Sequence, residues 1–160
     1  MPNNKSKGSK VERELFQMFI SEGTYRVVRV AGSGTMENAD CDLLAGKKGK
    51  KFAIEVKSSK KPIKYISKEQ IDRFVTFSEI FKLYPVIALR FNREGWFFIH
   101  PKEMKKTQKN WSINLEQAKK KGKRFTQFFS SINKKSKSKT NSKNKTKQET
   151  DYDLYLESLK

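Results

Sequence analysis

Cysteine and histidine are almost absent from this chain of 160 residues, which contains one of each. The single thiol, Cys41, cannot form a disulfide within the chain, so a reducing compartment is expected. Because Cys41 lies in an apolar segment, we predict that it is a small core residue. His100 precedes Pro101 at the end of an apolar segment and is predicted to be structural. The sequence therefore has neither the Cys and His spacing of a zinc site nor a P-loop.

Long hydrophobic runs are also missing. No segment approaches the run of about 18 apolar residues that a transmembrane helix requires. The first residues, MPNNKSKGSK, are basic but no apolar stretch follows them, so no secretory signal is predicted.

Acidic residues are few relative to basic ones, with 17 aspartates and glutamates against 36 lysines and arginines and a net charge of +19. Residues 1–106 carry a net charge of +10 and residues 107–160 one of +9, so both parts are basic. Such a chain attracts polyanions. Nucleic acid is favoured over a membrane, because the basic tail has almost no apolar residues to enter a bilayer. We therefore expect a cytoplasmic, nucleoid-associated protein with no membrane partner.

Apolar periodicity divides the first 106 residues into two helices and five strands. Ser9 and Glu12 form a capping-box pattern before a predicted helix that ends at Gly23, and Ser67 and Gln70 repeat the pattern before a second helix. The predicted strands are residues 25–30, 41–45, 52–57, 84–91 and 96–99, with a hairpin loop at residues 46–51. The order α-β-β-β-α-β-β predicts an α/β domain with a mixed five-stranded sheet flanked by helices.

Changes in composition predict five segments. These are a disordered basic N-terminus (1–8), a globular domain (9–106), an extension of uncertain location (107–129), a disordered Lys-rich tail (130–150) and a final peptide (151–160). The final peptide, DYDLYLESLK, is acidic and apolar. Two interpretations of it stay open: it docks on a partner protein, or it folds back on the domain.

Two carboxylates and a lysine with the spacing D-x(12)-E-x-K form the candidate active site: Asp42, Glu55 and Lys57. Asp42 and Glu55 are predicted on adjacent strands of a hairpin, where Cβ atoms on one face lie about 5 Å apart, so one divalent cation could bridge them. A backbone carbonyl at Val56 could be a further oxygen ligand. Lys57 could neutralise charge that develops on a phosphate. The alternative is a surface salt-bridge pattern on the polar face of a hairpin.

Further candidates for ligands and phosphate contacts surround this pattern. Glu12 could supply a third carboxylate, although it can simply complete the capping box, and Glu14 competes for the same role. Ser33 lies in the glycine-containing loop AGSGT, where it could donate to a phosphate. Arg13 and Arg29 could clamp phosphates. Metal-assisted chemistry on a phosphodiester is the favoured interpretation.

Six motifs occur in one order along residues 8–106. They are Gly8-x3-Glu12-Arg13-Glu14-Leu15, Arg29-x-Ala-Gly-Ser33-Gly, Asp42-Leu43, Ala53-Ile-Glu-Val-Lys57-Ser58, Ser67-x-Glu-Gln70 and Val86-x-Ala-x-Arg90-Phe91-x4-Trp96. The ordered set closely resembles the archaeal Holliday junction resolvases, which belong to the PD-(D/E)xK nuclease superfamily. One departure is Ala39-Asp40-Cys41, where superfamily members often have proline just before the catalytic aspartate.

The resemblance implies a restriction-endonuclease-like fold and a Mg²⁺-dependent endonuclease that cuts paired strands of four-way DNA junctions during recombination and repair. Asp42 and Glu55 would bind Mg²⁺, for which Mn²⁺ can substitute, and Glu12 would complete the acidic site. Lys57 would orient the attacking water and stabilise the transition state. Ser33 would touch the scissile phosphate.

The remaining implications concern DNA and protein partners. Arg13 and Arg29 would contact the flanking backbone, and Lys57 and Lys60 are further candidate DNA contacts. The family works as a homodimer. Five residues offer more apolar surface than one small sheet needs to bury, and they could form the dimer interface: Ile87, Leu89, Phe91, Trp96 and Phe98. The alternative is that they are ordinary core residues.

Two other functions stay compatible with the sequence. One is a non-catalytic branched-DNA-binding protein on the same fold, and the other is a nuclease of the superfamily that acts on another DNA, such as a flap. A replication or repair protein is the expected partner if residues 151–160 dock outside the domain.

Overall fold

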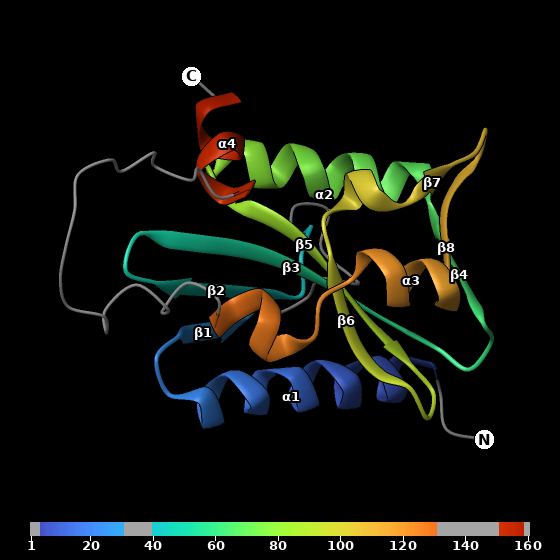
Figure 1. Ribbon diagram of the computed structural model, residues 1–160, viewed down its shortest axis with the longest axis horizontal. Helices are drawn as coiled ribbons and strands as arrows, with labels where there is room; N and C mark the ends of the chain where they lie inside the picture. The colour runs from blue at the N-terminus through green and yellow to red at the C-terminus, as the bar shows by residue number, and fades with distance from the viewer. Residues whose placement is uncertain (1–3, 31–39, 131–150, 159–160) are drawn as a thin grey trace, which may run out of the picture.

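The structure, a computed structural model, describes residues 4–30, 40–130 and 151–158. A mixed sheet of five strands lies between helix α1 (Asn4–Glu22) and helix α2 (Lys68–Ile80), as Figure 1 shows. Its strands, in spatial order, are β1 (Arg26–Arg29), β2 (Leu43–Lys47), β3 (Lys50–Ser59), β5 (Tyr84–Phe91) and β6 (Gly95–Ile99). β3 and β5 are parallel, and the other neighbouring pairs are antiparallel. The predicted mixed five-stranded sheet is confirmed.

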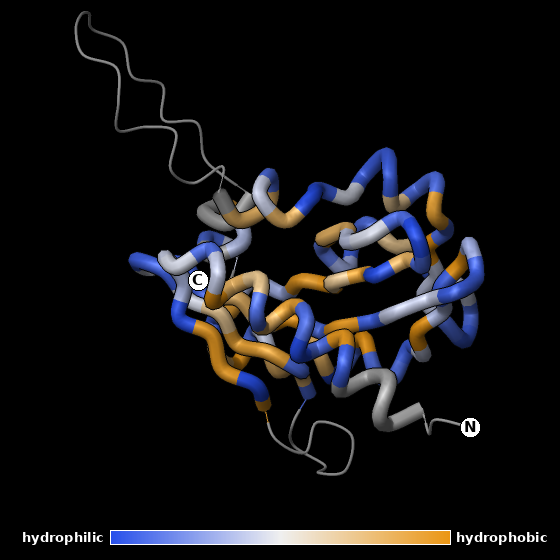
Figure 2. The backbone as a smooth tube through the Cα atoms, turned by 90° about the horizontal axis from the view of Figure 1, so that it is seen from below, coloured by the Kyte–Doolittle hydropathy of each residue, from blue (hydrophilic) through white to orange (hydrophobic). Residues whose placement is uncertain are grey.

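Two hydrophobic clusters occupy the two faces of this sheet, because successive strand residues point to opposite sides. Leu15 and Phe19 of α1 pack in the cluster that contains Ile54 of β3. Ile71 and Phe74 of α2 pack in the other cluster, which also contains Cys41. Cys41 is fully buried, as the sequence predicts. Figure 2 shows the apolar segments in orange through the interior and hydrophilic segments in blue at outer turns.

The hairpin between β2 and β3 is tighter than the sequence predicts. The predicted loop at residues 46–51 is wrong, because both strands continue until Lys47 pairs with Lys50. Only Lys48 and Gly49 form the turn, with φ angles of 39° and 82°. Two consecutive residues with positive φ are typical of the two-residue turns whose twist matches paired strands.

A second sheet was not predicted from the sequence. It has three strands in the order β4 (Ile63–Ser67), β8 (Asn110–Asn114) and β7 (Lys105–Lys106), and lies beside the start of α2 (Figure 1). The short helix η1 (Pro101–Glu103) leads into β7, and His100 Nδ1 accepts a hydrogen bond from Lys102 N at 3.1 Å. His100 therefore caps a helix, in agreement with its predicted structural role.

The extension at residues 107–129 packs into the domain. After β8 it forms helix α3 (Leu115–Lys121) and the helical turn η2 (Thr126–Ser130). Phe125 and Phe129 are buried against Phe19, with ring centroids 5.0 and 4.8 Å from its ring. The aromatic residues whose location the sequence left open are thus part of the core beneath α1.

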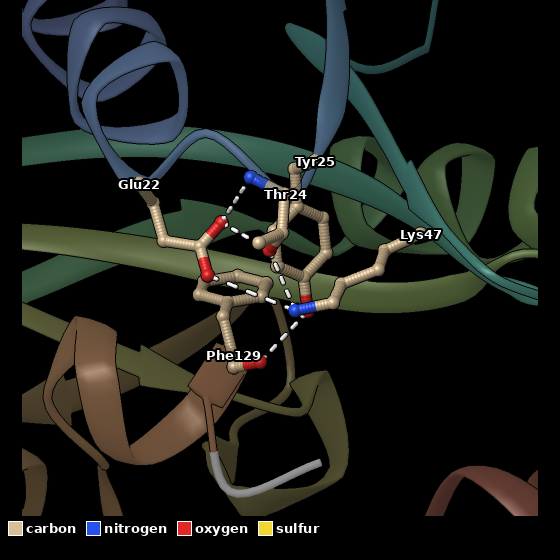
Figure 3. Close-up of polar contacts among 5 residues, drawn as sticks. All are labelled: Glu22, Thr24, Tyr25, Lys47 and Phe129. Atoms are coloured by element: carbon tan, nitrogen blue, oxygen red, sulfur yellow. Dashed lines mark hydrogen bonds and ion pairs between the residues drawn. The ribbon is translucent and has the colours of Figure 1, made fainter. Parts of the chain in front are cut away.

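A polar cluster joins the end of α1, the end of β2 and the turn η2 (Figure 3). Tyr25 Oη donates to the carbonyl oxygen of Phe129 at 2.8 Å, and Lys47 Nζ donates to Thr24 Oγ1 at 2.6 Å. Burial alone would raise the pKa of Glu22, but hydrogen bonds from Thr24 and the charge of Lys47 outweigh it and lower this pKa. The cluster satisfies its buried polar groups and fixes α1 relative to the sheet.

The two ends of the described chain differ from the predicted segments. The sequence predicts disorder for residues 1–8, but α1 begins at Asn4, since extending a formed helix requires no new nucleus. At the other end, helix α4 (Asp151–Ser158) lies on the domain, with the Tyr155 ring 5.4 Å from that of Tyr84. Of the two open interpretations, the structure therefore shows the peptide folded back. Ser33 and residues 131–150 lie outside the described residues. Every described helix is too short or too polar to span a membrane.

The apolar residues predicted as a dimer interface are core residues instead. These residues are Ile87, Leu89, Phe91, Trp96 and Phe98, and none is more than 7% exposed. The two helical layers and the C-terminal extension cover both faces of the sheet. The alternative of ordinary core packing is correct.

Candidate active site

The hairpin brings Asp42 next to the central strand β3, where Glu55 and Lys57 lie. Asp42 immediately precedes β2 and continues its pairing, because its N–H donates to the carbonyl of Ile54 at 3.0 Å. Its Oδ2 accepts a hydrogen bond from Val56 N at 2.7 Å. Asp42 is therefore held against the residue that follows Glu55, as expected from the spacing in the sequence.

Glu55 is the most unusual charged group of the site because only 5% of it is exposed. Burial raises its pKa to about 7, the Lys57 ammonium opposes this shift, and the negative charges of Asp42 and Glu12 add to it. Lys57 Nζ forms an ion pair and hydrogen bond with Glu55 Oε1. A carboxylate with a raised pKa is easily protonated. A cation bound nearby would lower this pKa again and so stabilise the ionised form of Glu55.

Gln70 is a residue of this site that sequence reasoning missed. It lies in the first turn of α2, and its Nε2 donates to Glu55 Oε1 at 2.8 Å. Its backbone N–H donates to Ser67 Oγ, the N-cap of α2, at 3.2 Å. The capping pattern in the sequence indicated that Gln70 begins a helix, but it gave no sign that the side chain turns toward β3.

Glu12 and Glu14 of α1 have different surroundings. Glu12 Oε2 accepts from Arg29 Nη2 at 2.8 Å, and its charge is felt by Glu55. Glu14 Oε1 accepts from Arg90 Nε at 2.8 Å and from Trp96 Nε1 at 3.0 Å, so it connects α1 to β5 and β6. Glu12, rather than Glu14, is therefore the α1 carboxylate beside the candidate site.

Arg13 and Lys60 are both exposed. Lys60 follows β3 directly, two residues beyond Ser58, and so lies near the same end of that strand as Lys57. Arg29 ends β1 and is held by Glu12. The candidate phosphate contacts thus come from α1, β1 and the end of β3.

The donor set suits a hard divalent cation. Within the described residues, no group of three or more Asp, Glu, His or Cys side chains is placed to hold a metal ion. Asp42 and Glu55 nevertheless supply two hard oxygen donors, and Mg²⁺ commonly binds through one or two carboxylates while retaining several waters. Burial raises the pKa of Glu55 and the negative charge of Asp42 adds to this effect, and a bound cation would favour the ionised form against both.

Gln70→Leu is expected to weaken divalent metal binding by about 10- to 100-fold, because the hydrogen bond that orients Glu55 is lost. Mn²⁺ titration by calorimetry measures this effect. Ser67→Ala is the matched control, since it removes the helix cap but leaves the amide on Glu55. Unchanged Mn²⁺ affinity in Gln70→Leu would show that Lys57 alone orients the carboxylate.

A mixed sheet between helices, with an aspartate at the second strand and a Glu-x-Lys on the third, defines the restriction-endonuclease-like class of nuclease folds. A sequence model of the family described as "Archaeal holliday junction resolvase (hjc)" matches residues 3–137. The chain therefore belongs to the archaeal Holliday junction resolvase family.

Individual relatives agree with this assignment. The "Crossover junction endodeoxyribonuclease Hjc" of Methanocaldococcus jannaschii is 42% identical over 108 residues, which cover 68% of this chain and 76% of that protein. The protein of the same name from Archaeoglobus fulgidus is 34% identical over 110 residues, covering 69% of this chain and 80% of the relative. A solved structure of Archaeoglobus fulgidus Hjc, described as a Holliday junction resolvase from an archaeal hyperthermophile, matches with a TM-score of 0.67 and 28% identity. This match covers 76% of this chain and 94% of that one.

Proposed function

We propose that this protein is a metal-dependent endonuclease that cuts paired strands of four-way DNA junctions during homologous recombination and repair, in the cytoplasm at the nucleoid. The observation that carries the proposal is the convergence of Asp42, Glu55 and Lys57 along the second half of β3. It is supported by membership of the resolvase family and by the net charge of +19, which favours a polyanionic substrate.

Asp42 and Glu55 would hold Mg²⁺, or Mn²⁺ in its place, with Glu12 and the Val56 carbonyl as further oxygen donors. The bound ion would polarise the phosphate and lower the pKa of a coordinated water. Lys57 lies beside Glu55 and would neutralise charge on the phosphate as the bond to the leaving oxygen breaks. Ser33 would donate to the scissile phosphate.

Arg13, Arg29 and Lys60 would contact the backbone on either side of the cut. A guanidinium has five N–H donors, so Arg29 can keep Glu12 and still bind a phosphate. Phosphate contacts carry no sequence information. Selection of a four-way junction would therefore depend on its shape, which would have to match the arrangement of these cations at the two active sites of a dimer.

Cleavage of a labelled four-way junction, with and without Mg²⁺, tests the function. We expect paired nicks only with the metal, and weaker cutting of a flap and of linear duplex. Tight, salt-sensitive junction binding with no cleavage in Mg²⁺ or Mn²⁺ would favour the non-catalytic alternative. Preferential cutting of the flap would favour a nuclease of another specificity.

We further propose that the protein is a homodimer and that the end of α2 forms its interface. Ile80 and Phe81 are 72% and 57% exposed, and with Phe77 they line a hollow that also contains Asp40 and Arg73. An apolar patch flanked by both signs of charge can pair with its own copy across a two-fold axis.

Phe81→Asp is expected to convert the dimer to an 18.7 kDa monomer, because a carboxylate would be desolvated in the interface. Sedimentation equilibrium at micromolar concentration measures the mass. Ile20→Asp is the matched control, since Ile20 is 51% exposed on α1. A wild-type protein that sediments as a monomer would overturn this interface.

A replication or repair protein is the partner proposed for residues 151–160. To use the buried side of α4 it would have to displace Tyr155 from its place beside Tyr84 and His100. The half-exposed Leu154 offers it a first apolar contact without such displacement.

A further inference from the structure

Lys64 is a lysine whose side chain lies on the inner face of the small sheet. It is the second residue of β4 and pairs directly with Ile113, which is fully buried. Ile66, two residues further along the same strand, is 2% exposed. Because residues i and i+2 of a strand share a face, Lys64 projects to the side that packs on the domain. It is half-buried, unlike its neighbours Lys60, Lys61 and Lys68, which are exposed.

The start of β4 lies against the end of β3, because Ser59 Oγ donates to the carbonyl oxygen of Ile63 at 3.2 Å. Lys64 follows Ile63, so its inward side chain lies near the end of β3 that carries Lys57. Burial lowers the pKa of Lys64, and the positive charge of Lys57 lowers it further. Two cations therefore face the same region at the end of β3. Lys57 is neutralised by Glu55, whereas the Lys64 side chain makes no ion pair or hydrogen bond within residues 4–30, 40–130 and 151–158.

A half-buried ammonium beside a second ammonium destabilises the folded protein unless an anion compensates it. Lysines elsewhere in the small sheet avoid this arrangement. Lys106, for example, is exposed, and its Nζ lies 5.4 Å from the centroid of the Trp111 ring. This is within the separation of about 6 Å at which an aromatic face attracts a cation. Lys64 is thus a half-buried cation that lies near a second cation and has no paired carboxylate among the described residues.

We propose that Lys64 binds a backbone phosphate of the DNA strand, adjacent to the phosphate that Lys57 contacts at the active site. The ligand class is a phosphodiester, because the site adjoins the carboxylates and the lysine of the proposed nuclease centre, and this inference rests on the proposed function. Lys64 binds the phosphate next to the scissile one and fixes the register of the strand. In the absence of DNA, the uncompensated charge of Lys64 lowers the stability of the folded protein.

Lys64→Met tests the proposal, because methionine retains much of the side-chain volume without the charge. We expect junction affinity in EDTA to fall by about tenfold and the log–log salt slope to decrease by about one. We also expect the melting temperature of the free protein to rise, since a desolvated, repelled cation is removed. Lys64→Arg is expected to retain affinity. Lys51→Met is the matched control, an exposed lysine on β3 toward the β2–β3 turn.

Each outcome has a defined meaning. Wild-type affinity and salt slope in Lys64→Met would overturn the proposal, and so would an equal loss in Lys51→Met, which would reflect overall charge. A lower melting temperature together with weaker binding would also overturn it, by assigning Lys64 a structural role. Failure of the wild-type protein to cut junctions in Mg²⁺, with the Lys64→Met affinity loss intact, would refute the proposed catalysis and leave the phosphate site standing.

Discussion

Asp42→Ala is expected to abolish cleavage of four-way junctions while junction binding persists. Asp42 and Glu55 are the two carboxylates that the β2–β3 hairpin holds beside Lys57, so removal of either takes away one of the two main ligands proposed for the metal. Metal ions stabilise charge in the transition state by several kcal/mol, so we expect the rate to fall by about three orders of magnitude or more. Binding should survive because the basic residues that attract phosphate are unchanged.

The alanine substitution also removes the acceptor of the Val56 N–H, so a second variant is needed to separate charge from structure. Asp42→Asn keeps a carbonyl oxygen for that hydrogen bond but removes the negative charge, and we expect it to be equally inactive. Glu116→Gln is the matched control, because Glu116 is an exposed carboxylate in the first turn of α3. Single-turnover cleavage and metal-free binding measure the two effects. Wild-type cleavage by Asp42→Ala would disprove the assignment of the site.

The main sheet was predictable because its signals are local. Alternating apolar residues gave the strands, and the short Lys-Gly connection made an antiparallel hairpin the natural pairing of β2 and β3. The proximity of Asp42 to Glu55 followed from that hairpin alone. The lengths of β2 and β3 could not be predicted in this way. Lys47 and Lys50 are polar and therefore indicate a loop, but they pair with each other in the sheet.

The remaining parts of the site depend on contacts between distant segments. Gln70 reaches Glu55 from another element, and its local capping role conceals this contact. The ion pair between Glu12 and Arg29 likewise requires α1 to cross beside β1. Lys64 carried no signal at all, since β4 becomes a strand only by pairing with β8 far along the chain. The spacing of residues in the sequence cannot predict such contacts between distant segments.

The C-terminal extension was the least predictable part of the fold. Phe125, Phe128 and Phe129 stand among lysines and lack a clear period, so the sequence does not reveal which surface they cover. Their partners, Phe19 and Tyr25, lie near the other end of the chain. The extension is therefore recognisable as core only when both ends are placed together.

Phe129→Ala is expected to lower the free energy of unfolding by about 3–5 kcal/mol, the usual loss when a fully buried phenylalanine leaves a cavity. Phe129 is fully buried and its ring lies 4.8 Å from Phe19, 5.6 Å from Tyr25 and 5.4 Å from Phe52. The substitution leaves the Phe129 carbonyl in place, so the hydrogen bond from Tyr25 can persist. The loss should therefore report ring packing rather than the polar cluster.

Urea denaturation measures the change, with Phe128→Ala as the matched control because its ring is only half-buried. A loss in Phe129→Ala no larger than that of the control would contradict the structure's placement of η2 in the core.

Phe19 and Glu12 lie on the same helix, so the Phe129 ring that supports Phe19 also supports the third carboxylate beside the site. A weakened α1 should thus loosen Glu12 and Arg29, which makes residues 125–129 a structural support of the active site as well as of the fold.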